Sequence, residues 1–249
     1  MCLNNWGGID HKVLEFHEYV NLFSGKSGSG KSTVMDAIQV ILYGSFSPSF
    51  LNKAADDAKN RRSVLSYLRG EQKDGSANRK DCDFCSVIAL EIEDTGTHII
   101  TCIGIAFEVR KSDSEIKKFV YFSHSGKMPE SEYLTEQGVC YSNQEIKKLV
   151  SARTKSDDNR GKGEVNRIYG SKEAYLGTLY DVILGYIDQN RFITMEKSAI
   201  ALKMTNGTGQ FIRDYMFPKN TSNTIATISE QLDSYRQIKD KIEDLRKRI

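Results

Sequence analysis

The chain has 249 residues, of which 39% are hydrophobic and 27% charged, and its formal net charge at pH 7 is +2. This size fits one large domain or two small ones, and the composition is typical of a soluble protein with a sizeable core. No run approaches the ~20 apolar residues of a membrane span and the N-terminus lacks an export signal, so we expect a cytoplasmic protein without a membrane partner. The small net charge neither requires nor excludes a polyanionic partner.

The chain contains five cysteines, an odd number in a protein too large to need disulfides, so we expect free thiols. Only Cys82 and Cys85 have a spacing found in metal sites, and His98 or Cys102 supply no recognisable second pair of ligands. We interpret the two as ordinary strand cysteines rather than as part of a structural zinc site.

The first expected element is a hairpin. Residues 3–9 (LNNWGGI) and 13–16 (VLEF) have the composition of two short strands, with Gly7 and Gly8 near the turn between them.

A second pattern predicts the order strand, glycine loop, helix. The apolar run at 20–24 (VNLFS) ends directly on Gly25 and predicts a strand. Apolar residues at helical spacing predict a helix over 33–43. The segment between them is therefore in the position of a phosphate-binding loop.

Residues 25–32 read GKSGSGKS and fit the phosphate-loop pattern GxxxxGK[ST], which arises by chance in about one chain of this length in a hundred. The glycines let backbone N–H groups turn toward phosphates, and the N-terminus of the following helix adds positive potential. We expect Lys31 to reach the β- and γ-phosphates, the Ser32 hydroxyl to ligate Mg²⁺, and Thr33 to support the α-phosphate side. With ATP and Mg²⁺ as cofactors, the predicted nucleotide-binding residues are Gly25, Lys26, Ser27, Gly28, Ser29, Gly30, Lys31, Ser32 and Thr33.

Hydrolysis needs a second, acidic element that holds Mg²⁺ and prepares water. The nearest candidate is 90–94 (LEIED), but it lies in an alternating strand pattern, where the acids are expected to face solvent. The chain also contains no LSGGQ-like signature. We therefore assign no catalytic residue.

The middle of the chain predicts a loop and then a sheet. Residues 45–80 are polar and indicate an insertion or long loop with a short helix over 62–68. An antiparallel meander is predicted over 84–122. Its aromatic residues Phe119, Tyr121 and Phe122 are interpreted as core rather than as a base-stacking surface. The strands of the meander are expected at 84–93, 97–108 and 118–122.

The rest of the chain is expected to be mostly helical. A helix over 142–150 is followed by a charged, mobile segment at 151–163, and further helical segments are expected at 171–187 and 193–215. After residue 218, apolar residues recur every three or four positions to the last residue, which favours the start of a coiled coil over a helix packed on the domain.

This order of elements resembles the N-terminal half of an SMC-type ATPase head. Local segments are similar to the MukB-like branch of that family, which includes the MksB and JetC proteins of bacterial condensins and Wadjet plasmid-defence systems. Residues 5–9 (NWGGI) resemble its NWxGF-type first strand, and residues 211–218 (FIRDYMFP) resemble its LRDYLLP-type segment. Residues 50–55 and 61–70 are similar to FNxAA and YVRG-like stretches of the JetC type, which makes JetC the favoured member.

The resemblance implies an α/β, ABC/SMC-type P-loop NTPase head lobe with an antiparallel β subdomain, a helical lobe and a coiled-coil stub. It assigns residues 1–218 to the head lobe, with the phosphate loop at 25–33 and the helical lobe at about 142–217, and residues 219–249 to the coiled coil. Two heads would engage on ATP and couple its hydrolysis to DNA loop extrusion, plasmid restriction or chromosome organisation. Because the other motifs of such a site follow the returning coiled coil, this chain alone is expected to be inactive in hydrolysis.

The partners implied are the C-terminal half of the same head, a second head in a homodimer, kleisin and accessory subunits, and double-stranded DNA, in a nucleoid-associated protein. SMC heads also carry a glutamine that contacts Mg²⁺ where the helical lobe begins, and Gln189, Glu196 and Ser198 are alternatives for that position. A DNA repair ATPase of the SbcC or RecF-like type and a non-catalytic interaction module are alternatives to the SMC interpretation.

A basic cluster follows the predicted phosphate-loop helix. Its residues could contact DNA or brace a γ-phosphate, or they could belong to a solvated loop. The candidate nucleic-acid contacts are Lys53, Arg61, Arg62 and Arg69.

Overall fold

The computed structural model describes residues 1–26, 28–47, 51, 63–72, 75–157 and 165–200. The chain divides into two units, Met1–Ile193 and Thr194–Ile249. The sheet and all the helices described below except the end of the last one belong to the first unit.

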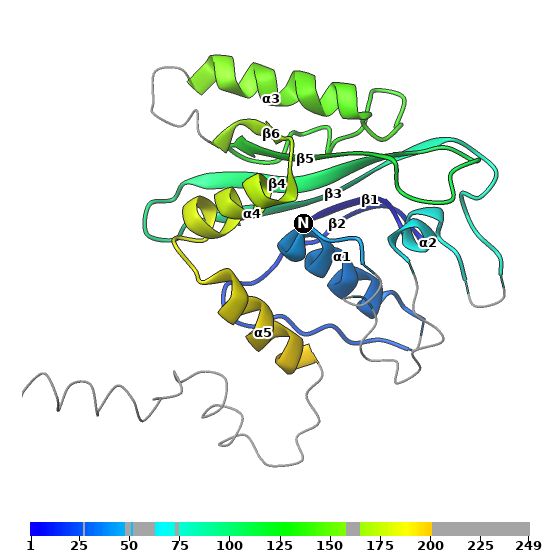
Figure 1. The fold of residues 1–249 in the computed structure, drawn as a ribbon, viewed down its shortest axis with the longest axis horizontal. Helices are drawn as coiled ribbons and strands as arrows, with labels where there is room; N and C mark the ends of the chain where they lie inside the picture. Colours follow the sequence, from blue (N-terminus) through cyan, green and yellow to red (C-terminus); the bar gives the residue numbers. More distant parts are fainter. Residues whose placement is uncertain (27, 48–50, 52–62, 73–74, 158–164, 201–249) are drawn as a thin grey trace, which may run out of the picture. The chain divides into compact units, whose positions relative to one another are not determined.

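The described residues form one antiparallel sheet of six strands, shown in Figure 1. Its order is β2-β1-β3-β4-β5-β6, so β1 pairs with β3 across a long stretch of sequence, with Leu3 opposite Ile88. The predicted hairpin, with its turn at Gly7 and Gly8, and the predicted meander are confirmed, but the second hairpin strand lies at Ile9–Val13 and not at 13–16. The expected antiparallel subdomain is not a separate sheet, because the β1–β3 pairing joins the meander to the hairpin. The strands are β1 (Cys2–Trp6), β2 (Ile9–Val13), β3 (Phe84–Glu93), β4 (Ile100–Val109), β5 (Lys118–Ser125) and β6 (Arg167–Tyr169).

Helices cover both faces of this sheet (Figure 1). On one face lie α1 (Lys31–Tyr43), α2 (Val64–Arg69) and α4 (Lys172–Gly177), which continues into a π-helical turn, η3 (Thr178–Ile183). On the other face lies α3 (Asn143–Asp157). The last described helix is α5 (Gln189–Ile200).

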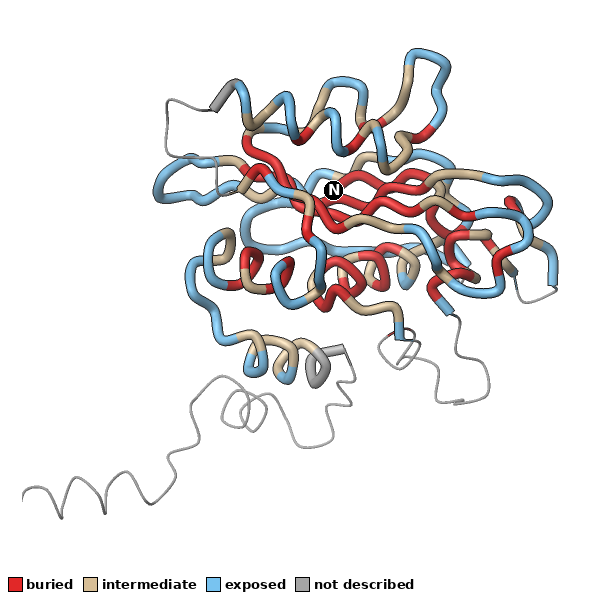
Figure 2. Tube along the Cα trace, turned by 45° about the horizontal axis from the view of Figure 1, so that its top comes forward, coloured by how far each residue is buried: buried red, intermediate tan, exposed pale blue. Residues whose placement is uncertain are grey.

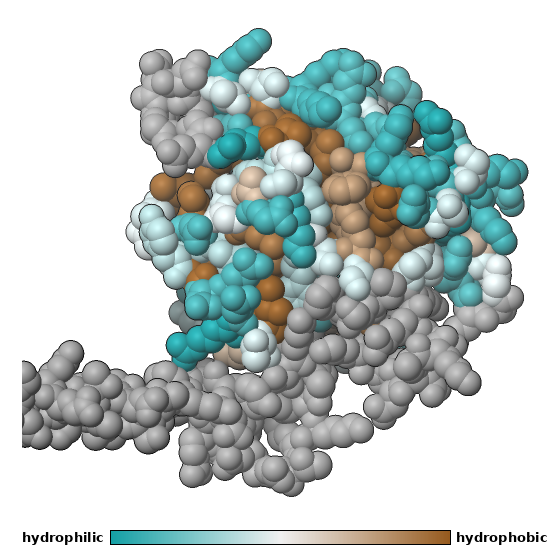
Figure 3. Space-filling model, in the orientation of Figure 1, coloured by the Kyte–Doolittle hydropathy of each residue, from teal (hydrophilic) through white to brown (hydrophobic). Residues whose placement is uncertain are grey.

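The strand side chains alternate between two hydrophobic cores in the described part of the chain. Ile88 of β3 packs under α1, α2 and α4, whereas its neighbours Val87 and Ala89 pack under α3, as the period of two in a strand requires. Figure 2 shows the buried segments concentrated in the strands and in the helix turns that face them. In Figure 3 hydrophilic residues cover the region of α3, at the top of the view, with apolar residues beneath them.

The meander aromatics take part in these cores, as predicted. Tyr121 packs under α1 and α4, with Phe119 against it, and Phe122 is fully buried under α3.

The five cysteines, all within the described residues, form no disulfide. Burial raises the pKa of Cys85, on β3, to about 11, so this thiol is held in its neutral form at physiological pH.

The structure differs from the predictions in one helix boundary, one additional strand and one strand that is not formed. Residues 151–157, expected to be mobile, continue α3, where the Thr154 hydroxyl donates to the carbonyl of Val150 at 3.0 Å. Strand β6, which no pattern indicated, pairs with β5 through Tyr169 opposite Tyr121. The strand expected at 20–24 is not formed. The predicted helical segment beyond residue 200 and the coiled coil at 219–249 lie outside the described residues.

The missing strand has a physical explanation. Its apolar side chains are exposed, with Val20 at 76% and Leu22 at 88% of their accessible surface. A strand needs a neighbour to pair its backbone groups, and the described residues place no strand beside 20–24. Local composition indicated the apolar run correctly, but it could not indicate the absence of that neighbour.

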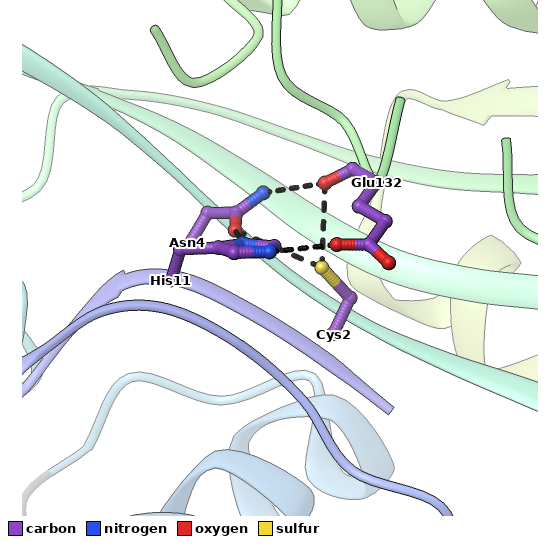
Figure 4. Close-up of polar contacts among 4 residues, drawn as sticks. All are labelled: Cys2, Asn4, His11 and Glu132. Atoms are coloured by element: carbon purple, nitrogen blue, oxygen red, sulfur yellow. Dashed lines mark hydrogen bonds and ion pairs between the residues drawn. The ribbon is translucent and has the colours of Figure 1, made fainter. Parts of the chain in front are cut away.

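A polar cluster joins the first hairpin to the loop after β5 (Figure 4). In His11, Nε2 lies 2.6 Å from a carboxylate oxygen of Glu132, and Nδ1 lies 2.6 Å from the side-chain oxygen of Asn4. The Asn4 amide donates to the Glu132 carbonyl at 2.8 Å, and the Cys2 thiol donates to the same carbonyl at 3.4 Å. Both ring nitrogens of His11 thus lie within hydrogen-bond distance of side-chain oxygens on other residues. Glu132 adopts φ 52°, a left-handed conformation that a non-glycine residue keeps only when such contacts hold it.

Replacing His11 with alanine is expected to lower the free energy of unfolding by about 1 kcal/mol, because one contact to the strained loop at Glu132 and one to Asn4 of β1 are lost. Urea denaturation at pH 7 would measure this. His98→Ala is the matched control, because His98 also pairs with a glutamate, Glu93, at 3.0 Å but is 77% exposed. An equal loss in both variants would contradict a special role for the His11 cluster.

Candidate functional site

The loop at 25–30 runs directly into α1, and two of its glycines adopt conformations that other residues rarely adopt. Gly28 has φ 83° and Gly30 has φ 86°. Among the described residues, and apart from the chain neighbours of each glycine, a Cβ at either position would meet no atom within 4 Å, so there is open space beside the loop at both. Glycine is required at these positions by the backbone, which can thus turn N–H groups toward a ligand in that space.

The two ends of α1 differ in the side chains that hydrogen-bond to their backbone groups. Gly30 is its N-cap, no side chain of the described residues caps this end, and the first turn carries no acidic residue. At the other end, tyrosine hydroxyls donate to helix carbonyls: Tyr175 to Ile41 and Tyr180 to Leu42, both at 3.0 Å. A helix leaves its first N–H groups and last C=O groups without intrahelical partners. Two of the C-terminal carbonyls are thus satisfied by side chains, whereas the N-terminal N–H groups and the helix dipole are placed to bind an anion.

Lys31 adds a full positive charge at this N-terminus. Its ammonium donates to the carbonyls of Gly25 and Lys26, at 2.7 and 2.9 Å, and to the Ser29 hydroxyl at 3.2 Å. The side chain therefore lies over the loop and not in the core. A flexible ammonium in this position can exchange loop carbonyls for phosphate oxygens, which bind a cation more strongly.

The next residues occupy the first turn of α1. Ser32 is exposed, so its hydroxyl oxygen, a type of ligand that Mg²⁺ prefers, is accessible. Thr33 is half-buried, and its carbonyl accepts a hydrogen bond from the indole of Trp6 at 2.9 Å. Ser27 lies outside the described residues. Apart from it, the structure brings the predicted loop residues together at the start of one helix, where the donor set fits a polyphosphate with Mg²⁺.

The acidic residues at the end of β3 are engaged in local contacts, as their strand pattern predicted. Glu91 accepts the backbone N–H of Met128 at 2.6 Å. Asp94 accepts the N–H groups of Gly96 and Thr97, each at 2.8 Å, and these bonds lower the pKa of the exposed carboxyl. Both acids face solvent and hold turns, so this segment supplies no acidic element beside the phosphate loop.

The remaining predicted site residues lie elsewhere. Gln189 is the first residue of α5, next to Asp188, whose carboxylate accepts the N–H of Arg191 at 2.8 Å. Arg69 ends α2, and its guanidinium donates to the carbonyls of Lys111 at 3.1 Å and Asp113 at 2.5 Å. The roles of Gln189 in Mg²⁺ binding and of Arg69 in DNA binding therefore stay predictions. Lys53, Arg61 and Arg62 lie outside the described residues, as does the side chain of Ser198, while Glu196 lies within α5.

A mixed α/β fold with a glycine-rich loop at an open helix N-terminus defines a P-loop ATPase domain. The family model of the AAA domain matches residues 1–249, and the chain belongs to this family of P-loop ATPases, which occurs in SMC-like proteins. Membership indicates nucleotide-binding ATPase activity, which in this family typically involves Mg²⁺. No curated protein matches the chain at a significant level. None of the helices in the described part of the chain has the length and apolar character needed to cross a membrane.

Proposed function

We propose that this chain is the ATP-binding half of an SMC-like head, in which the loop at 25–33 holds the phosphates and Ser32 ligates Mg²⁺. The observation that carries the proposal is the uncapped N-terminus of α1 beneath Lys31, with open space beside Gly28 and Gly30. Backbone N–H groups, a helix dipole and an ammonium there converge on one anion.

A composite site is supported by what lies immediately before the loop. The segment from Phe16 to Phe23 exposes large apolar side chains, which monomeric proteins rarely leave uncovered in a contiguous run. The C-terminal half of the head would cover this segment and supply the acidic residues that β3 does not provide. The exposed side chains are Phe16, Tyr19, Val20, Leu22 and Phe23.

The whole protein would act as a homodimer of heads that engage on ATP and separate on hydrolysis. The segments at 5–9, 50–55, 61–70 and 211–218, similar to those of the MukB-like branch, support a condensin-like role in DNA loop extrusion. Among its members we favour a JetC-type protein of a Wadjet plasmid-defence system, with kleisin and accessory subunits and double-stranded DNA as partners. The coiled coil from residue 219 would connect the head to the DNA-organising part of the complex.

Calorimetric titration of the purified chain with ATP tests the nucleotide site. We expect binding that is strengthened by Mg²⁺ and ATP turnover near zero, because the acidic element belongs to the other half of the head. Ser32→Ala should reduce the strengthening by Mg²⁺ about tenfold and leave metal-free binding unchanged, because it removes one metal ligand and no charge. Absence of ATP binding would refute the proposal, and robust hydrolysis by the chain alone would refute the composite site.

A further inference from the structure

Helix α1 is held at both ends by aromatic side chains that donate hydrogen bonds to backbone carbonyls. At the C-terminal end these bonds satisfy carbonyls that have no partner within the helix. Thr33 is different, because a carbonyl in the first turn of a helix already accepts the N–H four residues later. The bond from Trp6 is thus an additional restraint on the turn that carries Lys31 and Ser32. The donor and acceptor pairs are Trp6 to Thr33 at 2.9 Å, Tyr175 to Ile41 and Tyr180 to Leu42 at 3.0 Å, and Tyr121 to Gly44 at 2.6 Å.

Gly7, the residue after Trp6, contacts the same threonine from the β1–β2 turn. A Cβ at Gly7 would lie 2.5 Å from the Thr33 methyl group, closer than real Cβ atoms approach other atoms. Glycine is also suited to its φ of 60°. The last residue of β1 therefore contacts the carbonyl of Thr33 and the turn after it contacts the Thr33 side chain, next to the proposed Mg²⁺ ligand Ser32.

The third element of this arrangement is α2, through Tyr67. Its ring stacks on the indole of Trp6 with centroids 5.2 Å apart and planes 7° apart, and its carbonyl accepts the N–H of Gly7 at 2.8 Å. Its hydroxyl donates to the carboxylate of Asp36, one turn further along α1 from Thr33. Trp6, Tyr67 and Asp36 are all buried, so these contacts are shielded from water.

A buried arginine links the hairpin to α2. The guanidinium of Arg79 donates to the carbonyl of Gly7 and to that of Leu68 in α2, the latter at 3.0 Å. It also pairs with Asp10 of β2 at 2.7 Å. The hairpin turn and α2 are thereby joined to each other as well as to α1.

We propose that Trp6, Gly7 and Tyr67, here named the α1 latch, position the first turn of α1 for nucleotide binding, with Trp6 as the main positioning residue. This inference rests on the proposed function, in which that turn binds the phosphates and Mg²⁺. A phosphate loop works by aiming several N–H groups at one ligand, and such a site loses affinity when its supporting contacts allow it to shift by about 1 Å. The latch supplies that support from two other elements of the fold.

The test compares Trp6→Phe with Tyr175→Phe. Each removes a hydrogen-bond donor to a carbonyl of α1 from a fully buried aromatic residue and keeps an aromatic ring in place, but Tyr175 acts at the opposite end. Trp6→Phe also removes one ring of the indole, and the urea measurement reports the stability lost through that cavity. For each variant we would measure amide hydrogen exchange of α1 without nucleotide, the ATP affinity with Mg²⁺, and stability by urea denaturation. We expect Trp6→Phe to speed exchange at 34–37 and to weaken ATP binding about tenfold. Tyr175→Phe should speed exchange only near the C-terminal end of α1 and leave ATP affinity unchanged.

A second pair of variants tests the same contact without removing a donor. Gly7→Ala places a methyl group against Thr33, whereas Gly138→Ala introduces similar backbone strain, at φ 74°, where nothing lies within 4 Å. Only Gly7→Ala should weaken ATP binding when the two variants are equally stable.

The possible outcomes test the role of the α1 latch separately from the proposed nucleotide-binding function on which it rests. If amide exchange at residues 34–37 is unchanged in Trp6→Phe, the proposal that the α1 latch restrains the first turn of α1 is wrong, whether or not the protein binds ATP. Faster exchange with unchanged ATP affinity, or equal losses of affinity in Trp6→Phe and Tyr175→Phe, would overturn its positioning role. If the unmodified chain fails to bind ATP, the proposed function fails, and so does the role assigned to the latch.

Discussion

Replacing Lys31 with alanine is expected to lower the ATP affinity of the chain at least about a hundredfold while leaving the fold intact. Lys31 supplies the ammonium at the N-terminus of α1, and each charge-assisted hydrogen bond to phosphate contributes about 1.5–3 kcal/mol. Losing the contacts to both the β- and the γ-phosphate accounts for the expected hundredfold decrease in ATP affinity. Among the described residues, the hydrogen bonds of the Lys31 side chain go to the exposed loop, so its removal leaves no cavity in the core.

Titration calorimetry with ATP and Mg²⁺ would measure this loss, and circular dichroism would verify the fold. Lys12→Ala is the matched control, because Lys12 is an exposed lysine on β2 outside the phosphate loop. If the Lys31 variant kept the affinity of the unmodified chain, the loop would not be a phosphate site.

Acidification is expected to destabilise the protein through His124, a fully buried residue of β5. Its ring nitrogens lie 2.9 Å from the Tyr133 hydroxyl and 3.1 Å from the Ser125 carbonyl. Burial lowers the pKa of His124 to about 4, because the charged form would lose its hydration, and the nearby Arg153 also lowers it. The unfolded chain, with an ordinary pKa of about 6.5, binds a proton at a higher pH than the folded protein does.

The direction of the pH effect follows from these two values. Above about pH 6.5 the residue is neutral in both states, and the folded state keeps its full stability. As the pH falls from about 6.5 to about 4, protonation favours the unfolded chain. The free energy of unfolding should fall by about 2 kcal/mol at pH 5 and by about 3 kcal/mol in total at about pH 4.

Urea denaturation at pH 7 and pH 5 would measure this difference. In His124→Gln, which keeps a donor and an acceptor but does not titrate, the loss between the two pH values should shrink by about 2 kcal/mol. The exposed residue His98 provides the control variant, His98→Gln, which should retain the loss seen in the unmodified protein. Equal pH dependence in the unmodified protein and the His124 variant would assign the acid sensitivity to other groups.

The sequence by itself was sufficient to predict the features that depend on residues close together in the chain. Helix α1 followed from apolar residues at helical spacing, because the residues on one face of a helix recur with a fixed period. The strands of the meander followed from their β-branched and aromatic residues, which are enriched in strands. The phosphate loop followed from residues 25–32 alone, because glycine freedom and a lysine at a fixed offset are local requirements of the chemistry.

The tertiary structure decided what depends on residues far apart in the chain. The hydrogen bond from Trp6 to Thr33 spans 27 positions, and the one from Asn4 to Glu132 spans 128, so no local pattern could indicate either. The pairing of β1 with β3 joined the predicted hairpin to the predicted meander in one sheet, and the lack of a neighbouring strand in the described residues left 20–24 unpaired. Periodicity reports which face of an element is apolar, but it carries no information about the element that covers that face. The sequence thus determined that a phosphate loop is present, and only the fold determined which residues hold its helix in place.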